Sequence, residues 1–161
     1  MNKYWSLILI LFLFAESCKK EKRYVYETQQ QELYQNANDK RNLKTTTQFI
    51  TIAYNDLFND NITTTELNKL DIALQAVGDK GVVQDLIVKN FINRPGVVIT
   101  DNTAMRSDIP AFVNDAYLRL YNRKPTEVEA WKMKSLIENN TDISPKMVYY
   151  SMMTAEEYRF Y

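Results

Sequence analysis

The residue types that carry most enzyme chemistry are scarce in this chain of 161 residues. It contains no histidine and a single cysteine, Cys18. Serine–histidine and cysteine–histidine catalytic arrangements are therefore impossible within this sequence, as are zinc sites built from histidine and cysteine ligands. The three glycines form no phosphate-binding loop.

Two glutamates are the remaining catalytic candidates. Glu66 and Glu129 occupy equivalent positions in two similar stretches, and paired carboxylates are what a glycoside hydrolase needs. Each glutamate, however, follows a threonine, Thr63 or Thr126, by three residues. This spacing is typical of a capping box, in which the hydroxyl and the carboxylate bind backbone amides at a helix start. The capping role explains both glutamates, so we expect a non-enzymatic protein without cofactor or metal.

Cys18 directly follows a short apolar segment at the start of the chain. Lys3 supplies a positive charge, residues 7–14 are continuously apolar, and the small residue Ser17 precedes the cysteine. This is the anatomy of a signal peptide, and the apolar run is shorter than the roughly 20 residues that span a bilayer. Cys18 could be the last residue of an ordinary secretory signal. Lipid attachment is favoured, because a lone cysteine has no disulfide partner in an oxidising compartment.

Residues 14–18, Phe-Ala-Glu-Ser-Cys, resemble a bacterial lipobox, and with the lysine-rich residues 19–23 they look like the start of Bacteroidota lipoproteins. The resemblance implies cleavage before Cys18, acylation of that cysteine and a lipid anchor in the cell envelope. Only Glu21 interrupts the basic run after the cysteine, so the acidic signal of surface export is missing. We expect an outer-membrane position facing the periplasm.

The chain divides into three parts. Residues 1–17 are the predicted signal peptide, residues 18–46 a polar, lipid-anchored tether, and residues 47–161 a helical domain. The tether has too few apolar side chains to offset the entropy of ordering. The mature chain carries 19 basic and 19 acidic side chains, since Lys3 and Glu16 are removed from 20 of each. Bulk charge therefore does not favour nucleic acid as a partner.

The helical domain repeats itself. Residues 48–59 align with residues 111–122 at a constant offset of 63, and eight positions are identical as far as Lys69 and Lys132. Such self-similarity indicates an internal duplication. Apolar side chains recur at helical spacing in both copies, and each copy is expected to hold three helices. The prediction is an all-α fold with a first unit over 47–93 and a second over 108–161, packed as one domain.

The second copy carries a resemblance of its own. Residues 111–129 contain an aromatic helix and the turn Arg-Lys-Pro-Thr-Glu-Val-Glu, and residues 154–158 read Thr-Ala-Glu-Glu-Tyr. This pattern is similar to small helical domains of unknown function found beside planctomycete-type cytochrome domains. The resemblance implies a helical fold and no particular activity, and the absence of Cys-x-x-Cys-His implies no haem.

Aromatic residues concentrate at the C-terminus. Tyrosine and phenylalanine supply large contact area with a polar handle at interfaces, although here they could equally close the second unit. The candidate interaction residues are Tyr149, Tyr150, Tyr158, Phe160 and Tyr161. Two functions are expected from these features. The first is a non-catalytic scaffold subunit of an envelope complex, with the bilayer and membrane proteins as partners, and the alternative is a module that binds glycan or peptidoglycan through its aromatics.

Overall fold

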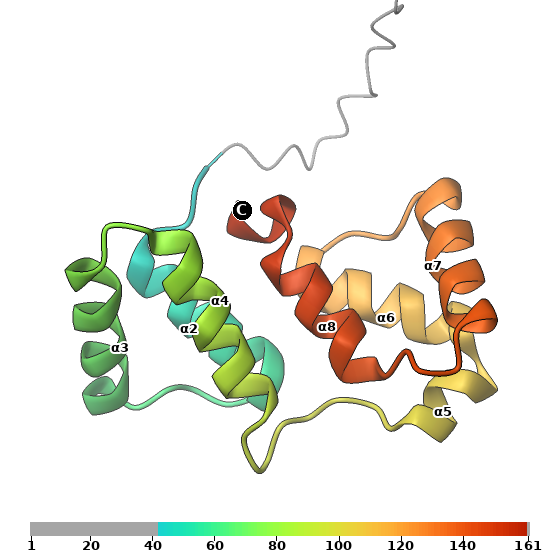
Figure 1. The fold of residues 1–161 in the computed structure, drawn as a ribbon, viewed down its shortest axis with the longest axis horizontal. Coiled ribbons are helices and arrows are strands. Elements are labelled where there is room, and N and C mark those ends of the chain that lie inside the picture. The colour runs from blue at the N-terminus through green and yellow to red at the C-terminus, as the bar shows by residue number, and fades with distance from the viewer. Residues whose placement is uncertain (1–41, 161) are drawn as a thin grey trace, which may run out of the picture. The chain divides into compact units, whose positions relative to one another are not determined.

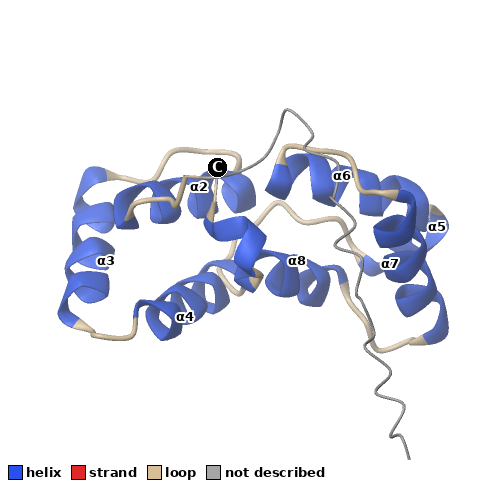
Figure 2. Ribbon diagram, turned by 90° about the horizontal axis from the view of Figure 1, so that it is seen from above, coloured by secondary structure: helices blue, strands red, loops and turns tan. Residues whose placement is uncertain are grey.

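The computed structural model describes residues 42–160, and this part of the chain is all-α, as predicted (Figures 1 and 2). The predicted signal peptide, Cys18, most of the tether and Tyr161 lie outside the described residues. The elements are α2 (Thr46–Phe58), α3 (Thr64–Ala76), α4 (Lys80–Ile92), α5 (Asn102–Ser107), α6 (Ile109–Tyr121), α7 (Glu127–Asn139), α8 (Pro145–Thr154) and the 3-10 helix η1 (Glu156–Arg159).

A polar side chain caps the start of each α-helix by accepting a backbone N–H. The residues are Thr45, Thr63, Asp79, Asp101, Asp108, Thr126 and Ser144. The predicted capping box of Thr126 and Glu129 is complete. The box predicted for Thr63 is only half formed, because the Thr63 hydroxyl accepts from the Glu66 N–H while the Glu66 carboxylate pairs with Arg94. A further complete box joins Thr45 and Gln48.

The helices of the two units keep the offset of the sequence repeat. α2 and α6 each span 13 residues and start 63 residues apart, and α3 and α7 do the same. Asn59 and Asn122, which end α2 and α6, both adopt the left-handed conformation with φ of 53°. The third helices differ, since α8 has 10 residues and α4 has 13. A common origin of the two units stays a prediction.

Some local predictions were wrong. α3 ends at Ala76, with Val77 extended as its C-cap. The short helices α5 and η1 were not predicted. The tether does not extend to residue 46, because Lys44 is buried and α2 starts at Thr46. Residues 97–100 belong to no helix or strand and lie between α4 and α5.

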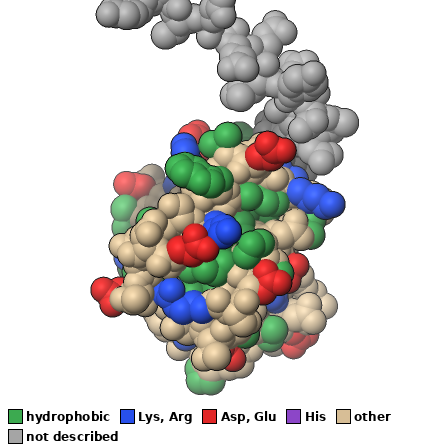
Figure 3. Space-filling model, turned by 90° about the vertical axis from the view of Figure 1, so that its right-hand side faces the viewer, with side chains coloured by type: hydrophobic (Ala, Val, Ile, Leu, Met, Phe, Trp, Pro, Cys, Tyr) green, Lys and Arg blue, Asp and Glu red, His purple; other side chains and the backbone are tan. Residues whose placement is uncertain are grey.

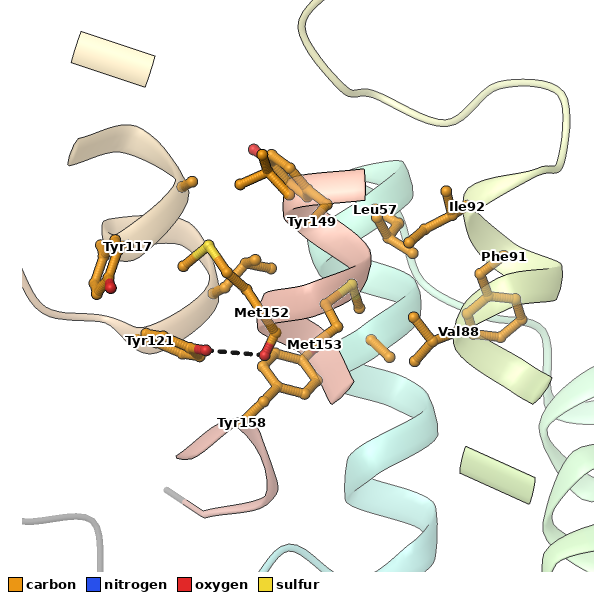
Figure 4. Close-up of a cluster of buried hydrophobic side chains, with 14 of the residues drawn as sticks. Leu57, Val88, Phe91, Ile92, Tyr117, Tyr121, Tyr149, Met152, Met153 and Tyr158 are labelled. Atoms are coloured by element: carbon orange, nitrogen blue, oxygen red, sulfur yellow. Dashed lines mark hydrogen bonds between the residues drawn. The ribbon is translucent and has the colours of Figure 1, made fainter. Parts of the chain in front are cut away.

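The buried side chains of both units belong to one hydrophobic cluster. α8 of the second unit lies between α6 of the same unit and α4 of the first unit, and it contacts both (Figure 1). The two units therefore pack against each other through α8. Leu57 and Val88 of the first unit face Met152, Met153 and Tyr158 of the second in the close-up of this core (Figure 4). Neither unit therefore has a complete core without the other.

Tyr158 of η1 closes this core and is fully buried, with 0% of its side chain exposed. Its ring meets Phe49 of α2 edge to face at 5.9 Å, and its hydroxyl donates to Asp56 Oδ2 at 2.7 Å. Lys44 donates its ammonium to the Tyr158 carbonyl and lies 3.9 Å from the ring centroid. Next to it, Leu43 and Phe160 form an isolated antiparallel bridge. The start and the end of the described chain are thus held together around one tyrosine.

We predict that Tyr158→Ala destabilises the protein by about 3–5 kcal/mol, as the loss of a buried aromatic ring does. Tyr158→Phe keeps the ring and removes only the donor to Asp56, so its cost should be about 1–2 kcal/mol. The matched control is Trp131→Ala, because that ring is 67% exposed and its loss should change stability by less than about 0.5 kcal/mol. Urea unfolding followed by circular dichroism measures all three.

Because the core is shared, each variant should unfold in a single transition. Two resolved transitions would show that the units fold independently and that the buried cluster does not couple them.

Candidate functional site

The predicted C-terminal aromatic surface is not a continuous exposed patch. Tyr149 and Tyr158 are buried, with 4% and 0% of their side chains exposed, so their assignment to a contact surface was wrong. Tyr149 packs in α8 against Phe112, with 6.3 Å between the ring centroids. Tyr149 fits the alternative considered from the sequence, in which it closes the second unit, whereas Tyr158 also packs on Phe49 of the first unit. Phe160 is half-buried, and Tyr161 lies outside the described residues.

Tyr150 is half-buried and bridges the two units. Its hydroxyl donates to Asp85 of α4, and Lys89 pairs with the same carboxylate at 2.9 Å while lying 5.3 Å from the Tyr150 ring. The hydrogen bond from Tyr150 and that from Lys89 lower the pKa of Asp85. Tyr150 is therefore engaged in an interhelical contact and has little free surface for a partner.

The two candidate catalytic glutamates do not share a site. Glu66 is in α3 and Glu129 is in α7, and these helices lie at opposite ends of the described helices in both ribbon views (Figures 1 and 2). Each carboxylate has an arginine partner of its own, Arg94 for Glu66 and Arg123 for Glu129. A mechanism with two carboxylates on either side of one bond is therefore not available to this pair.

Arg123 organises the residues of the sequence motif in the second unit. Its guanidinium donates to Glu129 at 2.7 and 2.9 Å and to Glu157 at 2.7 and 2.8 Å. The same group lies 5.2 Å from the Tyr117 ring and 5.7 Å from the Tyr121 ring. Planar guanidinium groups favour such bidentate pairs and aromatic neighbours. The ion pairs of Arg123 therefore link the turn before α7 to η1, which is a structural role.

This cluster shifts the ionisation of its members. The hydrogen bonds from Arg123 hold the pKa of Glu129 at about 2, well below its ordinary value, against the opposing effect of burial. The pKa of Arg123 is raised by the same bonds. Burial raises the pKa of Tyr117 and of Tyr121, and the Tyr121 hydroxyl donates to the Met152 carbonyl at 2.9 Å (Figure 4). All of these groups keep their usual charge at neutral pH.

The first unit builds the corresponding contact from a different residue. Arg94, which follows α4, pairs with Glu66 and lies 4.8 Å from the Phe91 ring. The turn before α3 contains Asp60, Asn61 and Ile62 where the turn before α7 contains Arg123, Lys124 and Pro125. The arginine therefore comes from a different place in each unit, while the two glutamates occupy equivalent positions.

Metal and membrane-spanning features are not found in the part of the chain that the structure describes. Among residues 42–160 no group of three or more histidine, cysteine or carboxylate side chains could hold a metal ion. Within the same range no helix is both long enough and apolar enough to cross a bilayer.

The largest exposed aromatic surface was not predicted. Among residues 42–160, Trp131 of α7 is the one largely exposed aromatic side chain. Val128 and Leu136 on the same helix are 60% and 50% exposed. Their counterparts at the offset of 63 are Thr65, Asn68 and Ala73, which are polar or small. We call Val128, Trp131 and Leu136 the α7 face; Val128 and Trp131 are one turn apart and lie together, whereas Leu136, five residues after Trp131, points about 140° away from it around the helix. The comparison between copies could have revealed the α7 face from the sequence.

Figure 3 looks onto the side of the molecule that carries α7. Apolar side chains are exposed there between acidic and basic ones, and neither sign of charge dominates the view (Figure 3). A contact on this side would therefore depend on apolar area with a mixed polar rim, which is the usual anatomy of a protein interface.

Comparisons of the chain with protein-family models, with curated proteins and with solved structures give no significant match. What the protein does is therefore inferred from its own residues and contacts.

The depressed pKa of Glu129 gives a prediction for acid stability. A carboxylate whose pKa is lower in the folded than in the unfolded chain stabilises the fold above its unfolded pKa and loses that contribution as the pH falls toward its folded pKa. The window for Glu129 runs from 4.5 down to about 2. Glu129→Gln keeps a capping side chain, so at pH 7 it should cost only about 1–2 kcal/mol for the lost charge-assisted bonds.

The difference in unfolding free energy between wild type and Glu129→Gln should shrink between pH 5 and pH 3 in urea titrations. The control is Glu138→Gln on the same helix, whose exposed carboxylate lies 3.7 Å from Lys134 and should contribute little at either pH. A wild-type advantage over Glu129→Gln that does not change with pH would contradict the assigned role of the ion pair.

Proposed function

We propose that this protein is a lipid-anchored, non-catalytic interaction subunit of a bacterial cell-envelope complex of the secretion, transport or motility type. The anchor is the acylated Cys18, the membrane is the outer membrane, and the helical domain faces the periplasm. The signal-peptide anatomy ending in Cys18 supports the anchor. A bilayer-tethered protein meets its partner at high effective concentration, so a modest contact surface is sufficient.

The proposal that the protein is not an enzyme is supported by the ion pairs and hydrogen bonds that its carboxylates already make within the fold. Glu66, Glu129 and Glu157 are paired with arginines, and Asp85 is paired with Lys89 and Tyr150. Among the described residues no buried side-chain nitrogen or oxygen lacks a hydrogen-bond partner. Catalytic groups are commonly held in strained or incompletely satisfied environments, and these ion pairs show the opposite arrangement.

The observation that carries the interaction role is the α7 face. α3 has the same length and the same place in its unit, yet it exposes Thr65, Asn68 and Ala73 where α7 exposes Val128, Trp131 and Leu136. The fold of the repeat therefore does not require these apolar side chains at the surface. Tryptophan is strongly enriched among the residues that dominate binding energy at protein interfaces. We therefore place the partner contact on α7.

The alternative function is glycan or peptidoglycan binding. A tryptophan ring could stack on a sugar, and Trp131 is the side chain that would do so. The burial of Tyr149 and Tyr158 removes the aromatic surface from which this alternative was first drawn. It is kept as an outcome of the experiment below.

Lipid attachment is tested in cells with an alkynyl fatty acid. The wild-type protein should be labelled and recovered with outer membranes, whereas Cys18→Ala should carry no label. The control is Ser17→Ala, which keeps a small residue before the cysteine and should be labelled normally. Label on Cys18→Ala, or its absence from the wild type, would refute the lipid anchor.

Partner binding is tested by recovering the tagged protein from detergent-solubilised membranes. Wild type should bring down membrane proteins in fixed proportion, and Trp131→Asn, which copies the residue of the first unit, should lose them at least tenfold. Ile72→Asn is the control, because Ile72 is an equally exposed apolar residue on α3. Sedimentation with purified cell wall that depends on Trp131, without co-purifying proteins, would favour the glycan-binding function instead.

A further inference from the structure

A groove of about 460 Å³ opens where the starts of α2 and α4 meet the C-terminal segment. Three cationic side chains from three separate segments line it: Lys44 before α2, Lys80 at the start of α4, and Arg159 at the end of η1. No aspartate or glutamate is among the residues that line it. The protein as a whole is electrically neutral, so this local excess of positive charge is set by the fold and not by composition.

Arg159 differs from the other arginines of residues 42–160. Arg94 and Arg123 bind carboxylates, and Arg106 and Arg119 donate to backbone carbonyls. The guanidinium of Arg159 makes no hydrogen bond or ion pair with any described residue. The Arg159 side chain is half-buried and lines the groove, so the donors of its guanidinium are reached by water and are available to a ligand. An anion in the groove would accept from them.

Gly81 allows Arg159 to occupy this place. A Cβ built on Gly81 would lie 2.9 Å from Arg159 Nη2, closer than side chains approach one another. The glycine therefore leaves the room in which the guanidinium lies against the first turn of α4.

The neighbouring groups extend the set of donors. The Gln84 side chain is one helical turn from Lys80, lines the groove, and has no hydrogen bond to the described part of the chain. Lys44 adds positive charge, although its ammonium already donates to the Tyr158 carbonyl. The nearest carboxylate to Gly81 is Asp79, and it is engaged in capping α4 through the N–H groups of Gly81 and Val82.

We propose that this groove binds a phosphate group. Arg159 presents its planar fork to two phosphate oxygens, Lys80 acts as a mobile point charge, and the Gln84 amide donates to the third oxygen. The phosphate belongs either to a phospholipid headgroup or to a soluble phosphate compound, since both offer the same oxygens. This binding does not depend on the acylation of Cys18 or on the α7 face.

The test is an NMR titration of the full chain in an uncharged detergent, following the Arg159 Nε–H and Gly81 amide signals. The probes are inorganic phosphate and glycerophosphoglycerol, which is the headgroup of phosphatidylglycerol without its acyl chains. Saturable shifts at millimolar or lower concentration, absent with chloride at equal ionic strength, are expected. Tighter binding of glycerophosphoglycerol identifies the lipid headgroup as the source, and tighter binding of inorganic phosphate identifies a soluble ligand.

Two variants locate the site. Arg159→Gln removes the guanidinium and should weaken binding about tenfold or more. Gly81→Ala keeps every charge but places a Cβ 2.9 Å from Arg159 Nη2 and 3.2 Å from Oδ1 of the capping Asp79, so the flexible end of Arg159 must move and binding should weaken; circular dichroism checks that the variant stays folded. Lys146→Gln on α8 removes one exposed charge outside the groove and should leave binding unchanged. Binding no stronger than that of chloride, or equal binding by wild type, Arg159→Gln and Gly81→Ala, would overturn the proposal.

Discussion

The burial of Tyr158 is the constraint on which the rest of the domain depends. A fully buried tyrosine contributes a large apolar ring but needs a partner for its hydroxyl, which Asp56 of the first unit provides. Burial and the Asp56 carboxylate raise the pKa of Tyr158 well above its ordinary value, so the hydroxyl remains a donor. Lys44 binds the carbonyl of the same residue and lies over its ring. One side chain thus ties η1 to α2 and to the residues that precede it.

Three consecutive residues of η1 consequently perform three tasks. Successive side chains of a 3-10 helix point about 120° apart. Glu157 binds Arg123 in the second unit, Tyr158 enters the core beside Phe49 of the first unit, and Arg159 lies against Gly81 in α4. The position of the basic groove is therefore not independent of the core. The same turn that buries the tyrosine fixes the arginine beside the start of α4.

What could be predicted from the sequence was the local part of the structure. Thr126 and Glu129 are three residues apart, so their capping box is visible in the sequence. The N-cap Ser144, followed by Pro145 at the first helical position, is visible in the same way. Arg123 and Glu157 are 34 residues apart, and nothing local reveals their contact. The aromatic residues could not be sorted by type. Tyr158 and Trp131 are both large and amphipathic, and only the packing of α2, α6 and α8 decides that one is enclosed and the other exposed.

The features that the two units share are the ones that the fold requires, and the features in which they differ are ones that the fold does not require. Several features recur at the offset of 63: the helix starts, the left-handed Asn59 and Asn122, and the glutamates of α3 and α7. Each glutamate pairs with an arginine, although that arginine comes from a different place in each unit. Those shared features stabilise helices and turns. The differences lie at the surface, where α7 exposes Trp131 in place of an asparagine, and at the end of the chain, where Arg159 is held over a glycine without a partner. Trp131 leaves a large apolar ring in water, and the half-buried Arg159 guanidinium donates to no described residue. Since the repeated framework needs neither, a binding partner would gain apolar contact area at the first and charge-assisted hydrogen bonds at the second.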